Sequence, residues 1–243
     1  MHLINPSITL RLMLIAFLAV FLLFTESLSS TSTVPPTQRP YVINGVRYYP
    51  INTSSGYVET GKASWYGPGF HGKRTSNGEL YDMNGPTAAH KTLPMNTILL
   101  VKNLENNKEA IVRVNDRGPF VRGRIIDLSY TTAKYLNVLR KGTAKVRITA
   151  LAPSLNGKIQ AGVDFDRGEF YVQIGSFKIK NNALRLQKRF VDSGHPTVII
   201  EYSTRNDLFY RVQVYAGNSL HHAKRSENAL LERGYSGAFI IAR

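Results

Sequence analysis

An internal repeat with a period of 40 residues runs through the last part of the chain. The segment Tyr171–Ile174 has a glutamine between branched residues, and Arg211–Val214 has the same pattern. Each segment precedes a stretch with apolar residues at helical spacing, over residues 182–193 and 219–233. Two strand–helix units can join their strands into one sheet, with the helices packed on it, in only a few ways. The repeat therefore predicts a small α+β domain.

Glycines mark the ends of both predicted helices. Gly194 and Gly234 follow them directly, and glycine commonly takes the left-handed position that ends a helix. The apolar segments 197–202 and 238–242 close the two units as strands. We therefore expect a βαβ-βαβ fold over residues 169–243.

Residues 57–152 contain short apolar runs that are typical of β-strands. The runs occupy residues 98–101, 110–114 and 145–151, and a turn with two asparagines separates the first two. One helix is predicted over residues 129–139, with its first residue, a serine, as the N-cap. Several short strands with a single helix predict a compact, mainly β barrel.

The N-terminus has the pattern of a secretory signal. Arg11 precedes an uncharged run, Leu12–Phe24, which is shorter than the roughly 20 residues of a membrane-spanning helix. Ser27 and Ser29 supply small residues before a cleavage site. We therefore expect residues 1–29 to be a signal peptide, with an uncleaved membrane anchor as the alternative. In either case the remainder of the chain leaves the cytoplasm.

Two segments have the composition of linkers. Residues 30–56 are rich in Ser, Thr, Pro and Asn, and a short strand is predicted within residues 41–49. Residues 153–168 contain a proline and an Asn-Gly pair. The predicted order is signal peptide, linker, barrel, linker and α+β domain.

Charge and cysteine content restrict the partners. The chain has 31 Lys and Arg against 16 Asp and Glu, a net charge of +15. Such a surface attracts polyanions, which include nucleic acids, acidic wall peptides and anionic lipids. Export argues against nucleic acid. The chain contains no cysteine, which excludes disulfides, thiolate metal sites and a lipid anchor on cysteine.

Five sequence blocks in residues 57–152 resemble the rare lipoprotein A family in their order and spacing. The blocks are Gly61–Gly67, Thr75–Asp82, Ala88–Pro94, Val114–Pro119 and Arg124–Ser129. The resemblance implies a six-stranded double-psi β-barrel with one or two short helices, acting on peptidoglycan glycan strands. The family is named for a lipidated N-terminal cysteine. Because this chain has no cysteine, we expect it not to be lipidated.

The C-terminal domain resembles SPOR modules through its opening strand, Phe170–Phe177. This resemblance implies an RNP-like fold that binds septal glycan strands lacking stem peptides. Together the two domains resemble the lytic transglycosylase branch of the family, which works in the envelope of bacteria with an outer membrane. We expect a periplasmic or envelope protein at the septum, with other division-site envelope proteins as further partners.

The reaction implied by the resemblance is cleavage of the MurNAc-β-1,4-GlcNAc bond, which aids cell separation. The 6-hydroxyl of the sugar takes the place of water and leaves a 1,6-anhydro end. One protein acid must protonate the leaving oxygen. This acid must be held protonated near neutral pH by burial or by a neighbouring carboxylate.

Four side chains in the blocks are candidates for this chemistry: Asp116, Asp82, Glu79 and His90. Asp116 ends a strand before a tight turn, so we expect it to be the acid, with Asp82 as the second carboxylate and His90 orienting one of them. The alternatives are a turn-forming Asp116, a solvated turn for Glu79 and Asp82, and a structural His90. For Asp127 we favour a structural role at the helix start.

Candidates for substrate binding are aromatic, arginine and amide side chains. They are Trp65, Tyr66, Tyr81, Arg117, Gln173 and Gln213, with Phe70 as a further aromatic. Aromatic faces offer flat apolar area to sugars, and glutamines on an open sheet face can bind hydroxyl groups. The alternatives are core packing, which we favour for Trp65, and a merely polar outer face for the two glutamines.

Neither a metal nor another cofactor is expected. His221 and His222 are adjacent and diverge on a helix, and the sequence has no glycine-rich phosphate loop. The basic aromatic motif of RNA-binding sheets is also absent, so no nucleic acid is expected. The leading hypothesis is a lytic transglycosylase. The alternative is a non-catalytic peptidoglycan-binding protein, since double-psi barrels of the expansin kind bind polysaccharide without turnover.

Overall fold

The computed structural model describes residues 34–152, 166–204 and 206–243. The predicted signal peptide and most of the second predicted linker lie outside the described residues. Among the helices that are described, none combines the length and the apolar character needed to cross a membrane.

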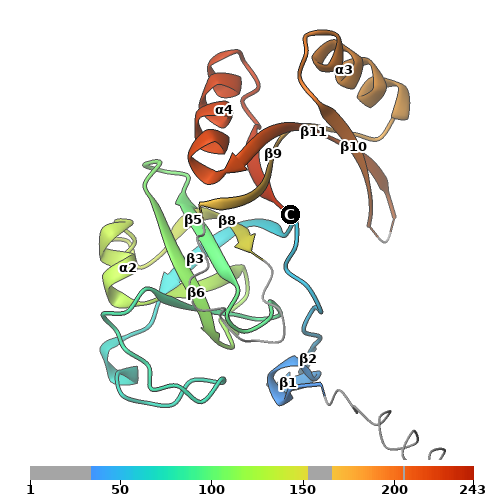
Figure 1. Cartoon of the computed structure of the whole chain (residues 1–243). Coiled ribbons are helices and arrows are strands. Elements are labelled where there is room, and N and C mark those ends of the chain that lie inside the picture. Colours follow the sequence, from blue (N-terminus) through green and yellow to red (C-terminus); the bar gives the residue numbers. More distant parts are fainter. Residues whose placement is uncertain (1–33, 153–165, 205) are drawn as a thin grey trace, which may run out of the picture. The chain divides into compact units, whose positions relative to one another are not determined.

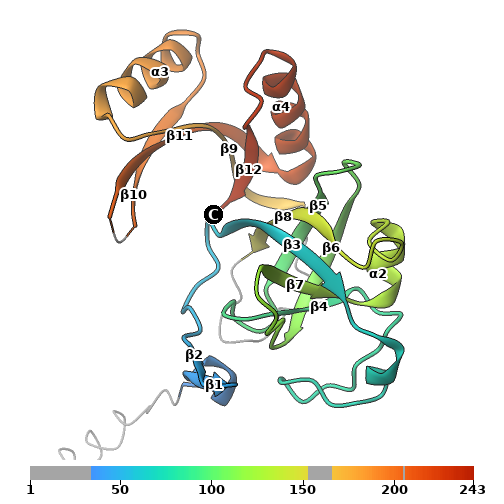
Figure 2. The same cartoon turned by 180° about the vertical axis from the view of Figure 1, so that it is seen from behind.

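Six strands close into a barrel (Figure 1). They are β3 (Val58–Trp65), β4 (Thr87–His90), β5 (Ile98–Asn103), β6 (Glu109–Asp116), β7 (Arg124–Leu128) and β8 (Ala144–Ala152). Their order around the barrel is β3-β7-β4-β6-β5-β8, and β8 pairs with β3 to close it. Figure 2 shows β3, β7 and β4 side by side. The parallel pairs β3–β7 and β4–β6 interlock the two halves, so the predicted double-psi barrel is confirmed.

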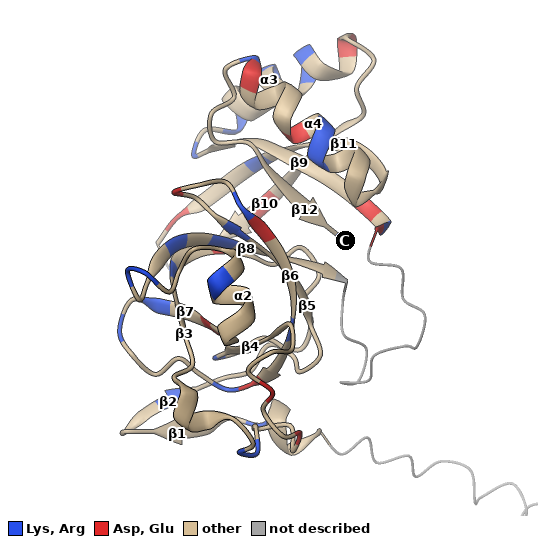
Figure 3. Ribbon diagram, turned by 90° about the vertical axis from the view of Figure 1, so that its left-hand side faces the viewer, with Lys and Arg blue, Asp and Glu red and all other residues tan. Residues whose placement is uncertain are grey.

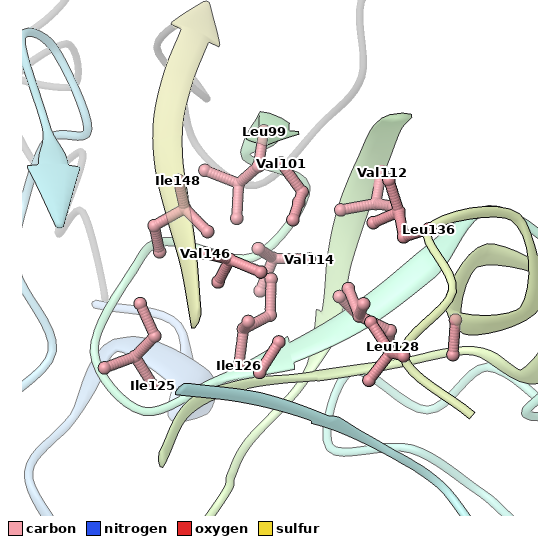
Figure 4. Close-up of a cluster of buried hydrophobic side chains, with 14 of the residues drawn as sticks. Leu99, Val101, Val112, Val114, Ile125, Ile126, Leu128, Leu136, Val146 and Ile148 are labelled. Carbon is pink, nitrogen blue, oxygen red and sulfur yellow. The ribbon is translucent and has the colours of Figure 1, made fainter. Parts of the chain in front are cut away.

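Branched apolar side chains from β5, β6, β7 and β8 fill the barrel, and β3 and β4 add small alanines (Figure 4). Leu99, Val114, Ile126 and Ile148 are fully buried, and each such side chain stabilises the fold by about 1.5–3 kcal/mol. The strands approach closely at Gly61, where an added Cβ would lie 2.5 Å from Cγ2 of Ile125. A side chain at this position would force Ile125 to shift, so the packing favours glycine.

Helix α2 (Tyr130–Tyr135) is shorter than the predicted helix over residues 129–139. Asn137 takes a left-handed φ of 60°, which ends the helix. Leu136 and Val138 are both fully buried, and a continued helix would direct side chains two positions apart to opposite faces. The left-handed residue lets both side chains reach the core. Ser129 is the N-cap residue, but its hydroxyl donates to Thr132 Oγ1.

A hairpin precedes the barrel, in the segment predicted to be a linker with a short strand. Strand β1 (Tyr41–Ile43) pairs with β2 (Val46–Tyr48). Asn44 and Gly45 form the turn with φ values of 50° and 75°. Two positive φ values are those of a type I′ turn, which joins antiparallel strands well and favours Asn-Gly.

The C-terminal domain is a four-stranded antiparallel sheet with two helices. Its elements are β9 (Arg167–Phe177), α3 (Lys180–Asp192), β10 (Thr197–Ser203), β11 (Leu208–Ser219), α4 (Leu220–Glu232) and β12 (Phe239–Ala242). The strand order is β10-β11-β9-β12, so the two repeated strands, β9 and β11, are neighbours. Chain order and pairing confirm the predicted βαβ-βαβ fold.

Caps explain where α4 begins and where both helices of this domain end. Ser219 precedes α4 and its hydroxyl accepts a hydrogen bond from His222 N at 3.2 Å. Gly194 and Gly234 follow α3 and α4 with φ values of 80° and 92°, as the repeat predicted. Val172, Val214, Phe190 and other apolar side chains form the core beneath the helices.

The positive charge is distributed over both domains. Lys and Arg, blue in Figure 3, occur on strands, helices and loops alike, and acidic residues lie among them. Several are paired, such as Lys188 with Asp192 on α3 and Arg113 with Glu79 in the barrel. The excess positive charge is therefore spread over the surface and attracts polyanions generally, and it does not form one binding stripe.

Candidate functional site in the barrel

Asp116, the last residue of β6, is surrounded by four hydrogen-bond donors. Its Oδ1 accepts from Ser76 N at 2.8 Å, from Ser76 Oγ at 2.5 Å and from Arg117 N at 2.7 Å. Its Oδ2 accepts from the Tyr66 hydroxyl at 2.8 Å. Oδ1 is thus saturated, whereas Oδ2 has one donor and keeps room for another partner. Oδ2 is the atom of this carboxyl group that can engage a ligand.

A small hairpin-like loop between β3 and β4 brings Ser76 to Asp116. Backbone hydrogen bonds join its two arms: Gly72 N to Tyr81 O, Tyr81 N to Lys73 O and Thr75 N to Glu79 O, at 2.8–2.9 Å. Gly78 turns the tip with a φ of 91°. Ser76, Glu79 and Asp82 therefore sit on one cross-braced loop. Nothing in the sequence distinguished Ser76 from other serines as a partner of Asp116.

Glu79 is bound by the arginine and asparagine side chains of β6. Arg113 donates to both of its carboxylate oxygens at 2.8 Å, and Asn115 donates to Oε2 at 3.2 Å. The Arg113 guanidinium, opposed by partial burial and helped by Asn115, lowers the pKa of Glu79. Glu79 is thus an ionised group that holds the loop against the residue before Asp116.

Asp82 lies at the exposed rim of the loop. Its carboxylate accepts from Asn84 N at 2.9 Å and lies 3.9 Å from His71 Nδ1. The side chain is 60% exposed. Neither contact is with Asp116, so the predicted pair of carboxylates is not joined by a direct hydrogen bond.

His90 is buried, and its side-chain hydrogen bonds are with residues other than Asp116 and Asp82. Its Nδ1 accepts from Thr92 N and Leu93 N at 3.2 and 3.0 Å, which places the proton on Nε2. Nε2 lies 3.3 Å from Glu59 Oε2, and the Tyr57 hydroxyl donates to the same oxygen at 2.6 Å. The expectation that His90 orients Asp116 or Asp82 is therefore corrected: its side chain binds Glu59 and organises the turn after β4.

This buried histidine predicts a pH-dependent stability of the barrel. Burial, opposed by Glu59, lowers the pKa of His90 below its ordinary 6.5. Hydrogen bonds from His90 and Tyr57 outweigh burial and lower the pKa of Glu59 below 4.5. Because the unfolded chain takes up protons more readily at both groups, the free energy of unfolding should fall through His90 as pH drops below about 6.5, and through Glu59 only below about 4.5, by at most about 1.4 kcal/mol per pH unit per group.

Urea unfolding between pH 5 and 7.5 measures this slope. His90→Asn keeps an acceptor for the two amides but cannot titrate, so the slope between pH 6.5 and 5 should flatten. His71→Asn, which alters a half-exposed histidine, serves as the control and should leave the slope unchanged. Equal slopes in the wild type and His90→Asn would show that burial of His90 does not govern the acid sensitivity.

The aromatic residues near Asp116 divide into buried and exposed members. Tyr81 is 4% exposed, and its ring centroid lies 4.8 Å from that of Tyr66. Trp65 packs on the barrel core and on Tyr130. Both make packing contacts, and their predicted contact with sugar stays a prediction. Phe70, 49% exposed and in contact with Tyr66, keeps exposed ring surface here, with the Lys73 ammonium 5.2 Å from its ring centroid.

Burial also determines the state of the tyrosines. It raises the pKa of Tyr81 to about 12. Burial and the neighbouring Asp116 raise the pKa of Tyr66 still further above its ordinary value. The Tyr66 hydroxyl therefore stays protonated and can donate to Asp116.

Asp127 is a structural residue, although not through the helix start as we expected. Its carboxylate accepts a hydrogen bond from the buried Ser64 hydroxyl. Arg124 Nη2 lies 2.7 Å from Oδ1 and 2.6 Å from Oδ2 of the same carboxylate. Ser64 and Asp127 are register partners on the parallel strands β3 and β7. The group therefore ties together the two halves of the barrel beside the site.

Gln173 and Gln213 of the C-terminal domain lie opposite each other on β9 and β11. Gln213 Nε2 donates to Gln173 Oε1 at 3.4 Å, and Arg243 donates to Gln213. The neighbouring Val172 and Val214 belong to the core, so the glutamines lie on the other face of the sheet. Their amides are already engaged with each other and with Arg243, a residue that the sequence did not single out.

Metal ligation finds no support in the part of the chain that the structure describes, because it contains no group of three or more His, Asp or Glu side chains suited to hold an ion.

Arg117 contributes its backbone amide to Asp116, while its guanidinium binds four carbonyl or amide oxygens nearby. The Arg117 side chain is therefore bound to protein atoms in this structure. Its predicted contact with substrate stays a prediction.

Comparison with known families agrees with this architecture. Residues 58–148 match the family described as lytic transglycolase, and residues 166–242 match the SPOR domain family. The first match spans most of the barrel and the second nearly all of the C-terminal domain. The hairpin of β1 and β2 lies outside both matches.

Curated relatives match over much of the chain. The endolytic peptidoglycan transglycosylase RlpA of Campylobacter jejuni is 47% identical over 182 residues, which are 68% of this chain and 66% of the relative. The protein of the same name from Helicobacter pylori strain 26695 is 39% identical over 230 residues, 84% of this chain and 72% of the relative. That from Vibrio cholerae is 45% identical over 157 residues, 65% of this chain and 54% of the relative. With this identity over this extent, the chain belongs to the RlpA family of endolytic peptidoglycan transglycosylases.

Proposed function

We propose that this chain is an endolytic lytic transglycosylase that cleaves the MurNAc-β-1,4-GlcNAc bond of peptidoglycan glycan strands. The observation that carries the proposal is Asp116, a carboxyl group with one saturated oxygen and one oxygen open to a ligand. A single residue of this kind is what the reaction needs, because the attacking nucleophile belongs to the substrate.

Asp116 acts as the proton carrier in this proposal. Its protonated Oδ2 gives a proton to the leaving O4 as the C1–O4 bond breaks. The 6-hydroxyl of the same MurNAc attacks C1, forms the C1–O6 bond and returns its proton to Oδ2. No water is consumed, and the product ends in a 1,6-anhydro sugar. The Tyr66 hydroxyl can donate to the ionised carboxyl group and accept from the protonated one, so it serves both states.

The other candidates take supporting roles. Glu79, kept ionised by Arg113, holds the loop that carries Ser76 in place. Asp82, on the exposed rim, supplies negative charge toward the positive charge that develops on the sugar ring. His90 acts through its backbone, because its carbonyl accepts from Arg117. Phe70 offers a face to a sugar ring.

The C-terminal domain directs the barrel to its substrate. A SPOR domain beside the barrel supports binding to peptide-poor glycan strands at the septum, with Gln173, Gln213 and Arg243 as polar groups of the sheet face. The activity then aids cell separation, in the periplasm or envelope of a cell with an outer membrane. Other envelope proteins of the division site are further partners of this proposal.

A non-catalytic peptidoglycan-binding protein remains the alternative function. The saturated Oδ1 of Asp116 supports it, since a carboxylate that binds backbone amides also stabilises a turn. The two functions differ in one product, the anhydro-ended fragment.

Incubation of the full chain with peptide-free glycan strands, followed by mass spectrometry, distinguishes them. A transglycosylase releases fragments from within the strand whose ends are one water lighter than those of a hydrolase. Strands that stay intact while they pellet with the protein would establish the binding function instead. Hydrolysed ends without the anhydro ring would contradict both.

A further inference from the structure

The guanidinium of Arg117 is held by four acceptors from two parts of the chain. Nη1 donates to the carbonyls of His90 and Leu93 at 3.2 and 2.5 Å. Nη2 donates to Thr37 O at 2.6 Å and to Gln38 Oε1 at 3.0 Å. Half of its partners thus come from the short 3₁₀ turn Pro36–Gln38, ahead of the barrel.

Residues 36–51, here named the N-terminal brace, are attached to the barrel beside Asp116. Ile51 N donates to Thr92 O at 2.8 Å, and the Tyr41 hydroxyl donates to Lys91 O at 2.7 Å. Gln38 Nε2 donates to Ile51 O at 3.2 Å, which closes the brace on itself. The brace therefore contacts the same turn after β4 whose carbonyls bind Arg117.

An aromatic cluster holds the brace to the other side of the Arg117 turn. Tyr41 stacks on Tyr48 with ring centroids 5.2 Å apart. Phe120, three residues beyond Arg117, contacts both rings, with centroids 6.1 and 5.4 Å away. Such contacts contribute about 0.5–1.5 kcal/mol per pair beyond the area that they bury. Both ends of the turn that follows Asp116 are thus connected to the brace.

We propose that the N-terminal brace positions the Asp116 site, and that Gln38 is a positioning residue for the reaction. The inference rests on the proposed function. The link is the backbone of Arg117: its side chain is held by Gln38, while its amide donates to Asp116 Oδ1 at 2.7 Å and to Ser76 Oγ at 3.2 Å. A shift of Arg117 removes one donor from Oδ1 and turns the carboxyl group away from its aligned geometry. Small misplacements of a reacting group cost large factors in rate.

The test uses three full-length variants. Gln38→Ala removes the acceptor for Arg117, and we expect kcat for release of anhydro-ended fragments to fall about ten-fold with KM unchanged within about two-fold. Gln38→Glu keeps an acceptor for Arg117 but loses the donor to Ile51, so it should restore most of kcat. Gln187→Ala removes a glutamine that donates to the carbonyl of Thr197 in the C-terminal domain, and should leave kcat unchanged.

Amide hydrogen exchange gives a second readout that does not depend on activity. The Arg117 amide should exchange about ten-fold faster in Gln38→Ala than in the wild type or Gln187→Ala, at the same melting temperature. An unchanged exchange rate and an unchanged kcat in Gln38→Ala would overturn the proposal, as would a loss that Gln38→Glu does not restore. If the wild type releases no anhydro product, the proposed function fails, and the exchange rates alone decide whether the brace holds Arg117.

Discussion

Replacing Asp116 with asparagine should lower the release of anhydro-ended glycan fragments by a factor of at least about 10². The amide has nearly the shape of the carboxyl group but cannot carry the transferred proton. Binding of the strand should persist, because the C-terminal domain and the barrel surface are unchanged. Initial rates with peptide-free strands, measured by mass spectrometry, give the factor.

Asp207→Asn is the matched control for this substitution. Asp207 accepts a hydrogen bond from Lys178 in the C-terminal domain. Its substitution by asparagine therefore makes the same chemical change away from the site. Asp116→Asn turns an NH₂ group toward one of the four donors, which should cost about 1–2 kcal/mol of stability and leave the chain folded at 25 °C. A folded Asp116→Asn variant with wild-type turnover would remove Asp116 from the mechanism.

Asp127→Ala should lower the free energy of unfolding by about 2–4 kcal/mol, the largest stability effect that we expect near the site. The substitution leaves the buried Ser64 hydroxyl and the Arg124 guanidinium without their shared acceptor. Because Arg124 keeps partial access to water, the loss should lie below that of a fully enclosed ion pair. Urea unfolding followed by the fluorescence of Trp65 measures it.

An exposed pair provides the contrast for Asp127. Lys188 and Asp192 form an ion pair on the surface of α3, and Asp192→Ala should change stability by less than about 0.5 kcal/mol. The double variant Ser64→Ala with Asp127→Ala should lose less than the sum of the single losses, since the two residues share one interaction. An Asp127→Ala protein as stable as Asp192→Ala would show that the parallel strands do not depend on this group.

Periodicity made the C-terminal domain predictable. Its repeat places the same strand, helix and glycine twice, and each of these signals is local: alternation for β9 and β11, helical spacing for α3 and α4, and a left-handed glycine after each helix. Three of the six barrel strands, β5, β6 and β8, were predicted from similar local runs, whereas β3, β4 and β7 were expected only through the family resemblance. The bounds of α2 were not, because the burial of both Leu136 and Val138 depends on what surrounds them.

The site itself was predictable only in part. Asp116 was found because it ends a strand before a tight turn, which is a local property. Its partners Tyr66 and Ser76 are 50 and 40 residues away in the sequence, and pairing over such distances follows from the order of strands in the closed barrel. His90 was expected beside a catalytic carboxylate, but the alternation of β4 directs it to Glu59, a residue outside the five sequence blocks.

The loop that carries Ser76 has a consequence for how the protein can be inactivated. Lys73 and Arg74 are exposed on this loop, where a trypsin-like protease can cut, while the six strands behind it remain hydrogen-bonded. One cut there separates Tyr66 from Ser76 along the chain without opening the barrel. Tyr66 and Ser76, which both donate to Asp116, would then belong to two chain segments held together only by noncovalent contacts, and we expect a glycan-binding particle with reduced turnover. Limited proteolysis is thus a way to weaken the lytic step while the wall-binding step continues.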